Sequence, residues 1–243
     1  SCNIVQADLV TDNANAYGVY MSRNASNNVV FNNSITTRGT DSYGVELFIT
    51  IYNNSVYGNS ITTSGVFGRG VRLISTSYNL VYSNNITTKG NNAEGIRLDT
   101  DAYNNSLYNN TITTSGSTSY GVNLISTAAY NAVYNNSITT SGSSGIGIRL
   151  SSVVYNNSIY NNSITTSGSS GFGINLDTTA YNNSVYGNSI TTSSISGYGI
   201  YLSFDVYSNN VYNNSITTSS GSGYGIYLLG SASTQVYNNS VYN

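Results

Sequence analysis

The stretch YNNSIYNNSITT, from Tyr155 to Thr166, decides the fold of this chain because close copies of it return at nearly constant intervals. Copies that begin at Tyr52, Tyr103 and Tyr181 each differ from it at two positions. We number every repeat from a recurrent glycine that precedes this stretch. The repeats then begin at Gly18, Gly44, Gly70, Gly95, Gly121, Gly147, Gly173, Gly199 and Gly225. The interval is 26 residues, with one of 25, so a single repeat family fills the chain and predicts one solenoid domain over residues 1–243.

The apolar residues of a repeat indicate strands. Positions 2 and 4 are apolar, as at Ile148 and Leu150, whereas position 3 changes freely, and positions 13 and 18 are aliphatic, as at Ile159 and Ile164. This alternation is typical of strands with one buried face. It predicts three short strands per repeat, at positions 1–5, 9–14 and 16–20. None of them can bury its apolar face alone, so the repeats must stack. The predicted fold is an all-β parallel β-helix of about nine coils, spaced about 4.8 Å apart.

Asparagine dominates the remaining conserved phases of the repeat. Position 15 is Asn in most repeats and Gly at Gly58 and Gly187, the two residue types that adopt the left-handed conformation at least cost, so a corner is predicted there. Counting by twos from the aliphatic positions places Asn at 11 and 16, and Thr at 20, on the inner face. An unpaired buried amide costs roughly 1–3 kcal/mol, so we expect these asparagines to bond to one another along the stack. The expected columns are Asn33, Asn59, Asn84, Asn110, Asn136, Asn162, Asn188 and Asn214, and Asn54, Asn105, Asn157, Asn183 and Asn209.

Charge is scarce, with seven Lys and Arg, nine Asp and Glu, and no His. No basic stripe is present to follow phosphates or anionic lipid, and no apolar run approaches the length of a membrane span, so we expect no nucleic-acid partner and no membrane insertion. Cys2 is the single cysteine and cannot form an intrachain disulfide. Without His or paired Cys the usual zinc, haem and triad chemistries are excluded, and we expect no cofactor.

The pattern G-I-x-L followed by N-x-I and again by N-x-I resembles the right-handed parallel β-helix repeats of the pectin-lyase-like superfamily, particularly those of NosD-like proteins and surface adhesins. The resemblance covers residues 2–243 and implies a right-handed helix. Because the superfamily includes pectate lyases, hydrolases, tailspikes, adhesins and structural proteins, it implies no single activity.

The densest charge constellation contains Glu46, Arg69, Arg72, Glu94, Arg97, Asp99 and Asp101. Of these, Glu46, Arg72 and Arg97 share position 3 in successive coils, and with Asp99 they are the residues considered below. We expect them to stand outward in a line. A polysaccharide lyase needs a cation to neutralise a uronate and a base to take its proton, so this line is the candidate substrate face of an enzyme. The acidic calcium cluster of pectate lyases has no match here. We favour the other interpretation, an exposed ion-pair ladder worth little in stability, and expect no catalytic or metal site.

Aromatic residues recur at position 14 and are expected to form an exposed column. Its members are Phe31, Tyr57, Tyr82, Tyr108, Tyr134, Tyr160, Tyr186, Tyr212 and Tyr237. A second column is expected near position 9. It comprises Tyr52, Tyr78, Tyr103, Tyr130, Tyr155, Tyr181 and Tyr207. The rings can stabilise one another along the axis, or serve lateral association or sugar stacking.

Ten of the twelve Asn-x-Ser/Thr sequons are assigned to two outward positions, 10 and 15. The candidate glycosylation sites are Asn32, Asn53, Asn104, Asn109, Asn135, Asn156, Asn161, Asn182, Asn213 and Asn238. Outward positions 17 and 19, such as Ser163 and Thr165, form a Ser-x-Thr array that resembles the face of β-helical ice-binding proteins.

Regular coils, few charges and no catalytic set favour a structural role. We expect an extracellular or cell-surface, N-glycosylated β-solenoid that acts as a stalk, an adhesin segment or a filament subunit stacking end to end, and that is a fragment or protomer of a longer rod. The alternatives are a carbohydrate-active enzyme (a lyase or hydrolase) or a carbohydrate binder, and then an ice-binding protein.

Overall fold

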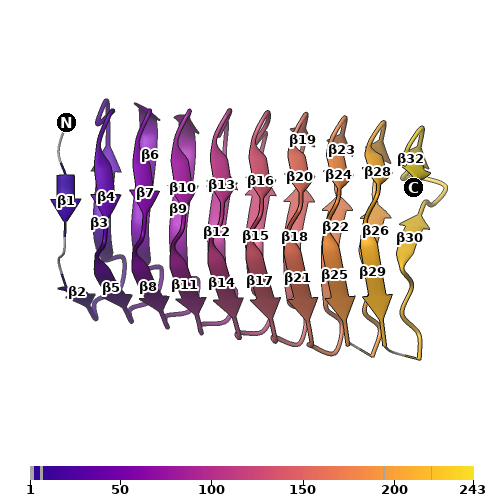
Figure 1. The fold of residues 1–243 in the computed structure, drawn as a ribbon, viewed down its shortest axis with the longest axis horizontal. Helices are drawn as coiled ribbons and strands as arrows, with labels where there is room; N and C mark the ends of the chain where they lie inside the picture. The colour runs from indigo at the N-terminus through magenta and orange to yellow at the C-terminus, as the bar shows by residue number, and fades with distance from the viewer. Residues whose placement is uncertain (1–2, 6–7, 194, 220) are drawn as a thin grey trace.

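The chain winds into a parallel β-helix whose coils stand side by side along the long axis of the molecule (Figure 1). The computed structural model describes residues 3–5, 8–193, 195–219 and 221–243. Cys2 lies outside the described residues. Each coil gives one strand to each of three long parallel sheets, which we call A, B and C, so the predicted stack of coils is confirmed.

The described strands pair only with their equivalents one coil away. Sheet A contains β1 (Asn3–Val5), β4 (Val29–Phe31), β7 (Ser55–Tyr57), β10 (Leu80–Tyr82), β13 (Ser106–Tyr108), β16 (Ala132–Tyr134), β20 (Ser158–Tyr160), β24 (Ser184–Tyr186), β28 (Asn210–Tyr212) and β32 (Ser240–Tyr242). Sheet B contains β2 (Asp8–Thr11), β5 (Ser34–Thr37), β8 (Ser60–Thr63), β11 (Asn85–Thr88), β14 (Thr111–Thr114), β17 (Ser137–Thr140), β21 (Ser163–Thr166), β25 (Ser189–Thr192) and β29 (Ser215–Thr218). Sheet C contains β3 (Tyr17–Ser22), β6 (Tyr43–Tyr52), β9 (Arg69–Ser77), β12 (Glu94–Asp99), β15 (Tyr120–Ile125), β18 (Ile146–Ser151), β22 (Phe172–Asp177), β26 (Ile200–Ser203) and β30 (Ile226–Leu229). A short fourth sheet contains β19 (Val154–Tyr155), β23 (Ala180–Tyr181), β27 (Val206–Tyr207) and β31 (Val236–Tyr237).

The segment predicted as one strand over positions 9–14 is divided in two. In the coil that begins at Gly147 it comprises β19 and β20, separated by Asn156 and Asn157. Asn156, at position 10, has a φ of 55°. Asn161, at the predicted corner of position 15, has a φ of 54°. The coils therefore turn sharply at these two corners, which most coils fill with Asn because Asn tolerates this left-handed conformation, while Tyr78, Ser83, Tyr130 and Ser208 adopt it in others.

The core is the column of aliphatic side chains that the repeat predicts. Ile148, Leu150, Ile159 and Ile164 are each at most 1% exposed, and their equivalents lie above and below them in other coils. Burial of one such side chain contributes about 1.5–3 kcal/mol, so the apolar positions of each coil stabilise the next.

Both asparagine columns run along the interior and satisfy their own amides. The backbone N–H and the Nδ2 of Asn162 donate to Oδ1 of Asn188 over 3.0 and 2.9 Å, and Nδ2 also donates to the carbonyl oxygen of Val133 over 2.9 Å. Asn157 bonds Asn183 in the same manner. The second column is longer than expected, since it also includes Asn28, Asn79, Asn131 and Asn239.

Candidate functional site

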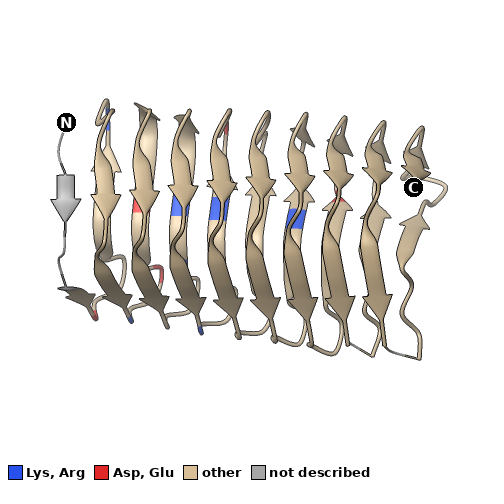
Figure 2. Ribbon diagram, in the orientation of Figure 1, with Lys and Arg blue, Asp and Glu red and all other residues tan. Residues whose placement is uncertain are grey.

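The outer face of sheet C carries the charged residues of the middle of the rod, and aromatic rings lie on both sides of them. Figure 2 shows charged residues of this face on the neighbouring strands β6, β9 and β12, and on β18, two strands further along the sheet. Towards the C-terminal coils, Phe172, Tyr198 and Tyr201 lie with ring centroids 5.1–5.3 Å apart. The repeat supplies this face because positions 3 and 5 point outward from every coil while position 4 points into the core.

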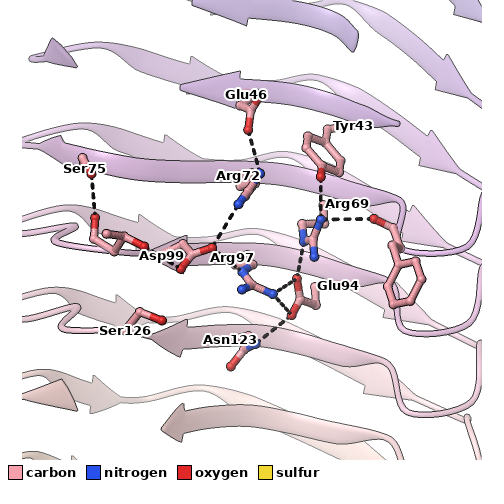
Figure 3. A network of polar contacts seen from close by, with 12 residues as sticks. Tyr43, Glu46, Arg69, Arg72, Ser75, Glu94, Arg97, Asp99, Asn123 and Ser126 are labelled. Atoms are coloured by element: carbon pink, nitrogen blue, oxygen red, sulfur yellow. Dashed lines mark hydrogen bonds and ion pairs between the residues drawn. The ribbon is translucent and has the colours of Figure 1, made fainter. Parts of the chain in front are cut away.

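Arg72 joins two carboxylates from neighbouring coils. Its Nη1 lies 3.1 Å from Oε1 of Glu46 and its Nη2 lies 3.1 Å from Oδ2 of Asp99 (Figure 3). Asp99 also accepts from Nε of Arg97 over 2.9 Å. The structure thus aligns Glu46, Arg72 and Arg97 on neighbouring strands, as the sequence predicted, and brings Asp99 into contact with both arginines.

Glu94 is the second centre of this network. Its Oε2 accepts from Nε of Arg69 over 2.6 Å, and its Oε1 accepts from Nη1 of Arg97 over 3.1 Å and from Nδ2 of Asn123 over 2.7 Å (Figure 3). Arg69 also donates to the hydroxyl of Tyr43 over 2.8 Å. Each carboxylate of this network therefore binds at least one guanidinium.

The expectation that these residues form an exposed ladder was wrong. Glu46 and Asp99 are only 3% and 5% exposed. They point away from the core, but the long arginine side chains of adjacent coils cover them, and the guanidinium of Arg72 lies 5.4 Å from the ring centroid of Tyr43. Buried ion pairs make strong individual contacts, yet desolvation offsets most of their contribution to stability.

The pKa values of Glu46 and Asp99 are shifted in opposite directions. Burial raises the pKa of Glu46 above its ordinary value despite the opposing effect of Arg72. Burial acts in the same direction on Asp99, but Arg97 and Arg72 outweigh it and the pKa of Asp99 is lowered. The stabilisation from Asp99 is therefore present at neutral pH and lost as the pH falls, whereas that from Glu46 is lost as the pH rises through its raised pKa.

A further ion pair on this face was not singled out from the sequence. Arg149 reaches Asp177 through two bonds, Nε to Oδ2 over 3.0 Å and Nη2 to Oδ1 over 3.1 Å. It joins position 3 of one coil to position 5 of the next, the same relation as Arg72 to Asp99. A search for opposite charges at one repeat plus two residues would have found both pairs.

Arg149 and Arg97 line a shared pocket of about 190 Å³ on this face. Glu94, Tyr120 and Asn123 contribute to its wall. Burial raises the pKa of Tyr120, so its phenol is protonated at neutral pH. Among the residues that the structure describes, no group of three or more His, Cys, Asp or Glu is placed to hold a metal ion.

The aromatic column at position 14 is a continuous stack with one corrected member. From Phe31 to Tyr212, consecutive ring centroids lie 4.8–5.2 Å apart and the planes differ by at most 12°. Its last member is Tyr242, which stacks on Tyr212, and not Tyr237. The final coil is longer than the others, with Asn209 bonding to a residue 30 positions later, and this insertion shifts its phase.

The second aromatic column is shorter than expected. Tyr155, Tyr181, Tyr207 and Tyr237 stack with centroids 5.0–5.1 Å apart. Tyr78 and Tyr130 lie one residue further along the coil than the members of this stack, although the ring of Tyr130 still meets that of Tyr155 edge-on at 5.7 Å. They lie at the left-handed corner, with φ values of 57° and 59°, where other coils have Asn.

From Phe31 to Tyr212 the rings of the position 14 column are half-buried rather than exposed, whereas the terminal Tyr242 is 54% exposed. Because each ring covers the faces of its neighbours, the column offers ring edges to solvent. A sugar needs a ring face to stack on, so the stacking interpretation of this column is not favoured.

The candidate glycosylation asparagines lie at the two corners, where their side chains are exposed, apart from that of Asn156, which is half-buried. Asn238 belongs to the position 10 corner and not to the position 15 corner, because of the same insertion. Its neighbour Tyr237 accepts from the backbone N–H of Ser208, which lies at position 10 of the preceding coil.

The family model for the right handed beta helix region matches residues 89–241. The chain belongs to the right-handed β-helix family. The predicted right hand of the β-helix is thereby confirmed. No curated protein matches the sequence.

Solved structures share the fold at low sequence identity. The mannuronan C-5 epimerase A-module of Azotobacter vinelandii has a TM-score of 0.62 and 13% identity over 99% of this chain and 76% of that one. A double mutant of the tailspike of Escherichia coli bacteriophage HK620 has a TM-score of 0.62 and 15% identity, over 97% of this chain and 49% of the tailspike. A periplasmic alginate epimerase, also a double mutant, has a TM-score of 0.57 and 14% identity, over 98% of this chain and 70% of that one.

These neighbours include carbohydrate-active enzymes and phage surface proteins. At such identities the likeness extends to the fold, and function has to be argued from this chain's own residues. No helix among the described residues is long and apolar enough to cross a bilayer.

Proposed function

We propose that this chain is a structural segment of an extracellular or cell-surface rod. The observation that carries the proposal is that a column of asparagine side chains and a column of aromatic rings continue from coil to coil along the molecule. The position 16 asparagines bond coil to coil from Asn33 to Asn214, and the position 14 rings stack from Phe31 to Tyr242. Sheet B keeps its register from β5 to β29 without a bulge. A stack of this kind resists bending and extension because every coil is bonded to both neighbours.

The charged face supports the same proposal. The carboxylates of Glu46, Glu94, Asp99 and Asp177 each accept from at least one arginine over 2.6–3.1 Å. A general base must be able to take a proton from a bound substrate, and Glu94 and Asp99 are poor bases because two guanidinium groups hold each of them. We therefore propose that neither acts as a catalytic base, and we assign no catalytic role to Glu46 or Asp177, which each pair with one arginine.

Three features belong to this proposal. The rod acts as a stalk, an adhesin segment or a filament subunit. Its coils associate end to end with further coils, because an uncovered strand edge accepts another parallel strand. Its corner asparagines carry N-glycans where the host glycosylates secreted proteins, since they are accessible and lie in sequons.

Imaging tests the rod and its association. Electron microscopy of native material should show rods or filaments with a repeat near 4.8 Å along the axis, outside the cell. Labelling of intact cells with a reagent that does not cross membranes should modify the protein. Labelling only after lysis, together with dispersed short particles, would contradict both the location and the assembly.

Intact-mass measurement tests glycosylation separately. A mass above the 25.8 kDa of the polypeptide, which returns to that value after enzymatic removal of N-glycans, is the expected result. Replacement of Asn161 and Asn109 by Gly keeps the left-handed corner and should remove the glycans carried there. An unmodified mass in native material would overturn this part.

A further inference from the structure

The aromatic column at position 14 carries phenol hydroxyls that its stacking does not require. Phe31 fills the same position and stacks on Tyr57 with ring centroids 5.2 Å apart and planes 12° apart. Every later member of the column, from Tyr57 to Tyr242, is nevertheless a tyrosine. Within the described residues no hydrogen bond of these hydroxyls is found, whereas Tyr43 uses its hydroxyl to accept from Arg69 over 2.8 Å. The phenols of the column are therefore free for chemistry that the fold does not need.

Tyrosine is the main oxidisable side chain of this protein. The chain has 24 Tyr but only one Met, one Cys, and no Trp or His, so a one-electron oxidant that reaches the rod from solution reacts chiefly with phenols. The single methionine, Met21, is only 8% exposed. Burial and the neighbouring phenols raise the pKa of Tyr82, Tyr108 and Tyr160 above the ordinary value. These phenols are therefore protonated at neutral pH, and their oxidation releases an electron and a proton together.

The geometry of the column favours electron transfer from ring to ring. From Tyr57 to Tyr242, consecutive ring centroids lie 4.8–5.1 Å apart and the planes differ by at most 11°. The rings are identical and equally spaced, so an electron that moves between two inner neighbours meets almost no difference in energy. From Tyr57 to Tyr212 each ring is half-buried. Its outer edge therefore meets water, which can accept and return the proton.

We propose that the position 14 column carries one-electron oxidation along the rod, with a diffusing radical oxidant as its substrate. The oxidant takes one electron from a phenol such as that of Tyr57, and the O–H proton passes to water, which leaves a neutral tyrosyl radical. Tyr82 then gives this radical an electron and loses its own proton to water, while Tyr57 regains a proton, so the radical moves by one coil. A reductant in solution ends the sequence by returning one electron, and water returns one proton. This activity needs only the folded column and is independent of where the rod is located and how it assembles.

A photo-oxidant attached near one end of the column tests the transfer. Cys2→Ser removes the native thiol, and Ser60→Cys places a single thiol at an exposed position of β8, three residues after Tyr57, for a ruthenium tris-bipyridyl label. Light and a cobalt(III) quencher convert the label to ruthenium(III), a one-electron oxidant, in the presence of a nitroso spin trap. Peptide mass mapping should find trap adducts on Tyr186 and Tyr212, which at about 4.8 Å per coil lie roughly 24 and 29 Å from Tyr57. Adducts that stop short of Tyr186 would overturn the proposal.

A phenylalanine in the middle of the column tests the role of the phenols. Tyr134→Phe keeps a stacked ring, as Phe31 does, but removes the hydroxyl three coils before Tyr212. Adducts on Tyr186 and Tyr212 should fall, because an electron then has to cross two coils, roughly 10 Å, in one step. Tyr78→Phe is the matched control, because Tyr78 is 58% exposed at a corner and no ring contact of it is found in the described chain, so it should leave these adducts unchanged. Equal yields in the two variants would refute the assignment.

A second variant and a mixing experiment cover the case in which Tyr134→Phe disturbs the fold or in which separate molecules oxidise one another. Tyr160→Phe, one coil further along, should lower the adducts on Tyr186 and Tyr212 in the same way, and an unchanged yield there would contradict the proposal. The labelled protein is also mixed with an equal amount of isotopically heavy protein that carries no label. Adducts should appear only on the labelled copies. Equal adducts on the heavy copies would show that the oxidation passes between molecules and would overturn transfer along the column.

Discussion

At the scale of single residues, the interior separates polar side chains that are satisfied from those that are not. Asn162 uses its amide in bonds to Asn188, Val133 and Tyr160, all between 2.9 and 3.1 Å. The threonines at position 20 are equally buried, but the Oγ1 of Thr140 and of its equivalents from Thr63 to Thr192 has no partner within the described residues. The asparagine columns hold the coils together, whereas the threonine column adds bulk at an energetic cost.

Thr140→Val should therefore stabilise the protein. The substitution keeps the shape and removes an unpaired hydroxyl, so the free energy of unfolding should rise by about 1 kcal/mol. Chemical denaturation measures it, and Thr139→Val is the control, since Thr139 is the exposed neighbour on β17 and should have almost no effect. Destabilisation by Thr140→Val alone would mean that the hydroxyl of Thr140 is hydrogen-bonded in the folded protein.

Gly147→Ala tests why every repeat has a glycine at position 1. A Cβ there would lie 2.3 Å from Cγ2 of Ile164 and 2.5 Å from the carbonyl oxygen of Gly173. Overpacking of this kind costs about 1–3 kcal/mol, and the cost should appear as a lower melting temperature. Gly221→Ala is the matched control because no atom lies within 4 Å of its added Cβ. Equal effects of the two substitutions would show that the close packing at position 1 is not limiting.

At the scale of elements, each sheet contributes a different column of outward side chains. Sheet A carries the stacked rings, sheet B the hydroxyls of Ser and Thr, and sheet C the ion pairs and the pocket. The stacked rings form because β20 and its equivalents pair in exact register, which places Tyr160 between Tyr134 and Tyr186. Such aromatic pairs contribute about 0.5–1.5 kcal/mol each beyond their buried area.

The tyrosine stack should make the protein sensitive to alkali. Burial and the neighbouring phenols raise the pKa of Tyr82, Tyr108 and Tyr160 above the ordinary value. A raised pKa in the folded state stabilises the protein below about pH 10, the value for an unfolded tyrosine, and that stabilisation is lost as the pH rises through the folded value.

Ultraviolet titration of the phenolates checks this expectation. The folded protein should titrate at higher pH than the same chain in urea, and the free energy of unfolding should fall above about pH 10. Coincident titration curves for the folded and denatured chains would contradict the argument.

At the scale of the whole molecule, stability depends on each coil having two neighbours. Strand β17 alternates exposed and fully buried residues, whereas the corresponding residues of β29 in the last complete coil are only half-buried. Leu228 and Val241 in the final coil are 44% and 46% exposed. In a repeat protein such coils open locally before the centre does.

Hydrogen exchange on the 243-residue chain should reveal that gradient. Amides of β17 and β21 should exchange more slowly than those of β29 and β30, because the central strands are covered on both sides. Uniform protection along the rod would indicate instead that the molecule unfolds as one cooperative unit.

The sequence by itself determined the coil. The period of 26 residues, the aliphatic phases and the asparagine positions are local and repeated, so the fold, both ladders and the corner at position 15 follow from them. The second corner at Asn156 could have been predicted from the sequence, since position 10 carries the same residue type as position 15. Tyr237 and Asn238 were assigned to the wrong positions of the repeat. The insertion in the final coil moves these residues relative to the other coils, while the local sequence motif around them stays the same.

Only the tertiary structure decided what lies between coils on the outside. The burial of Glu46 and Asp99 depends on how far the side chain of Arg72, from the coil between them, reaches across both. The pocket on sheet C exists because side chains of different coils line it together, among them Arg97, Asn123 and Arg149. These properties belong to contacts between residues of different coils, and the conformations of long side chains that make such contacts are not encoded in a repeat pattern.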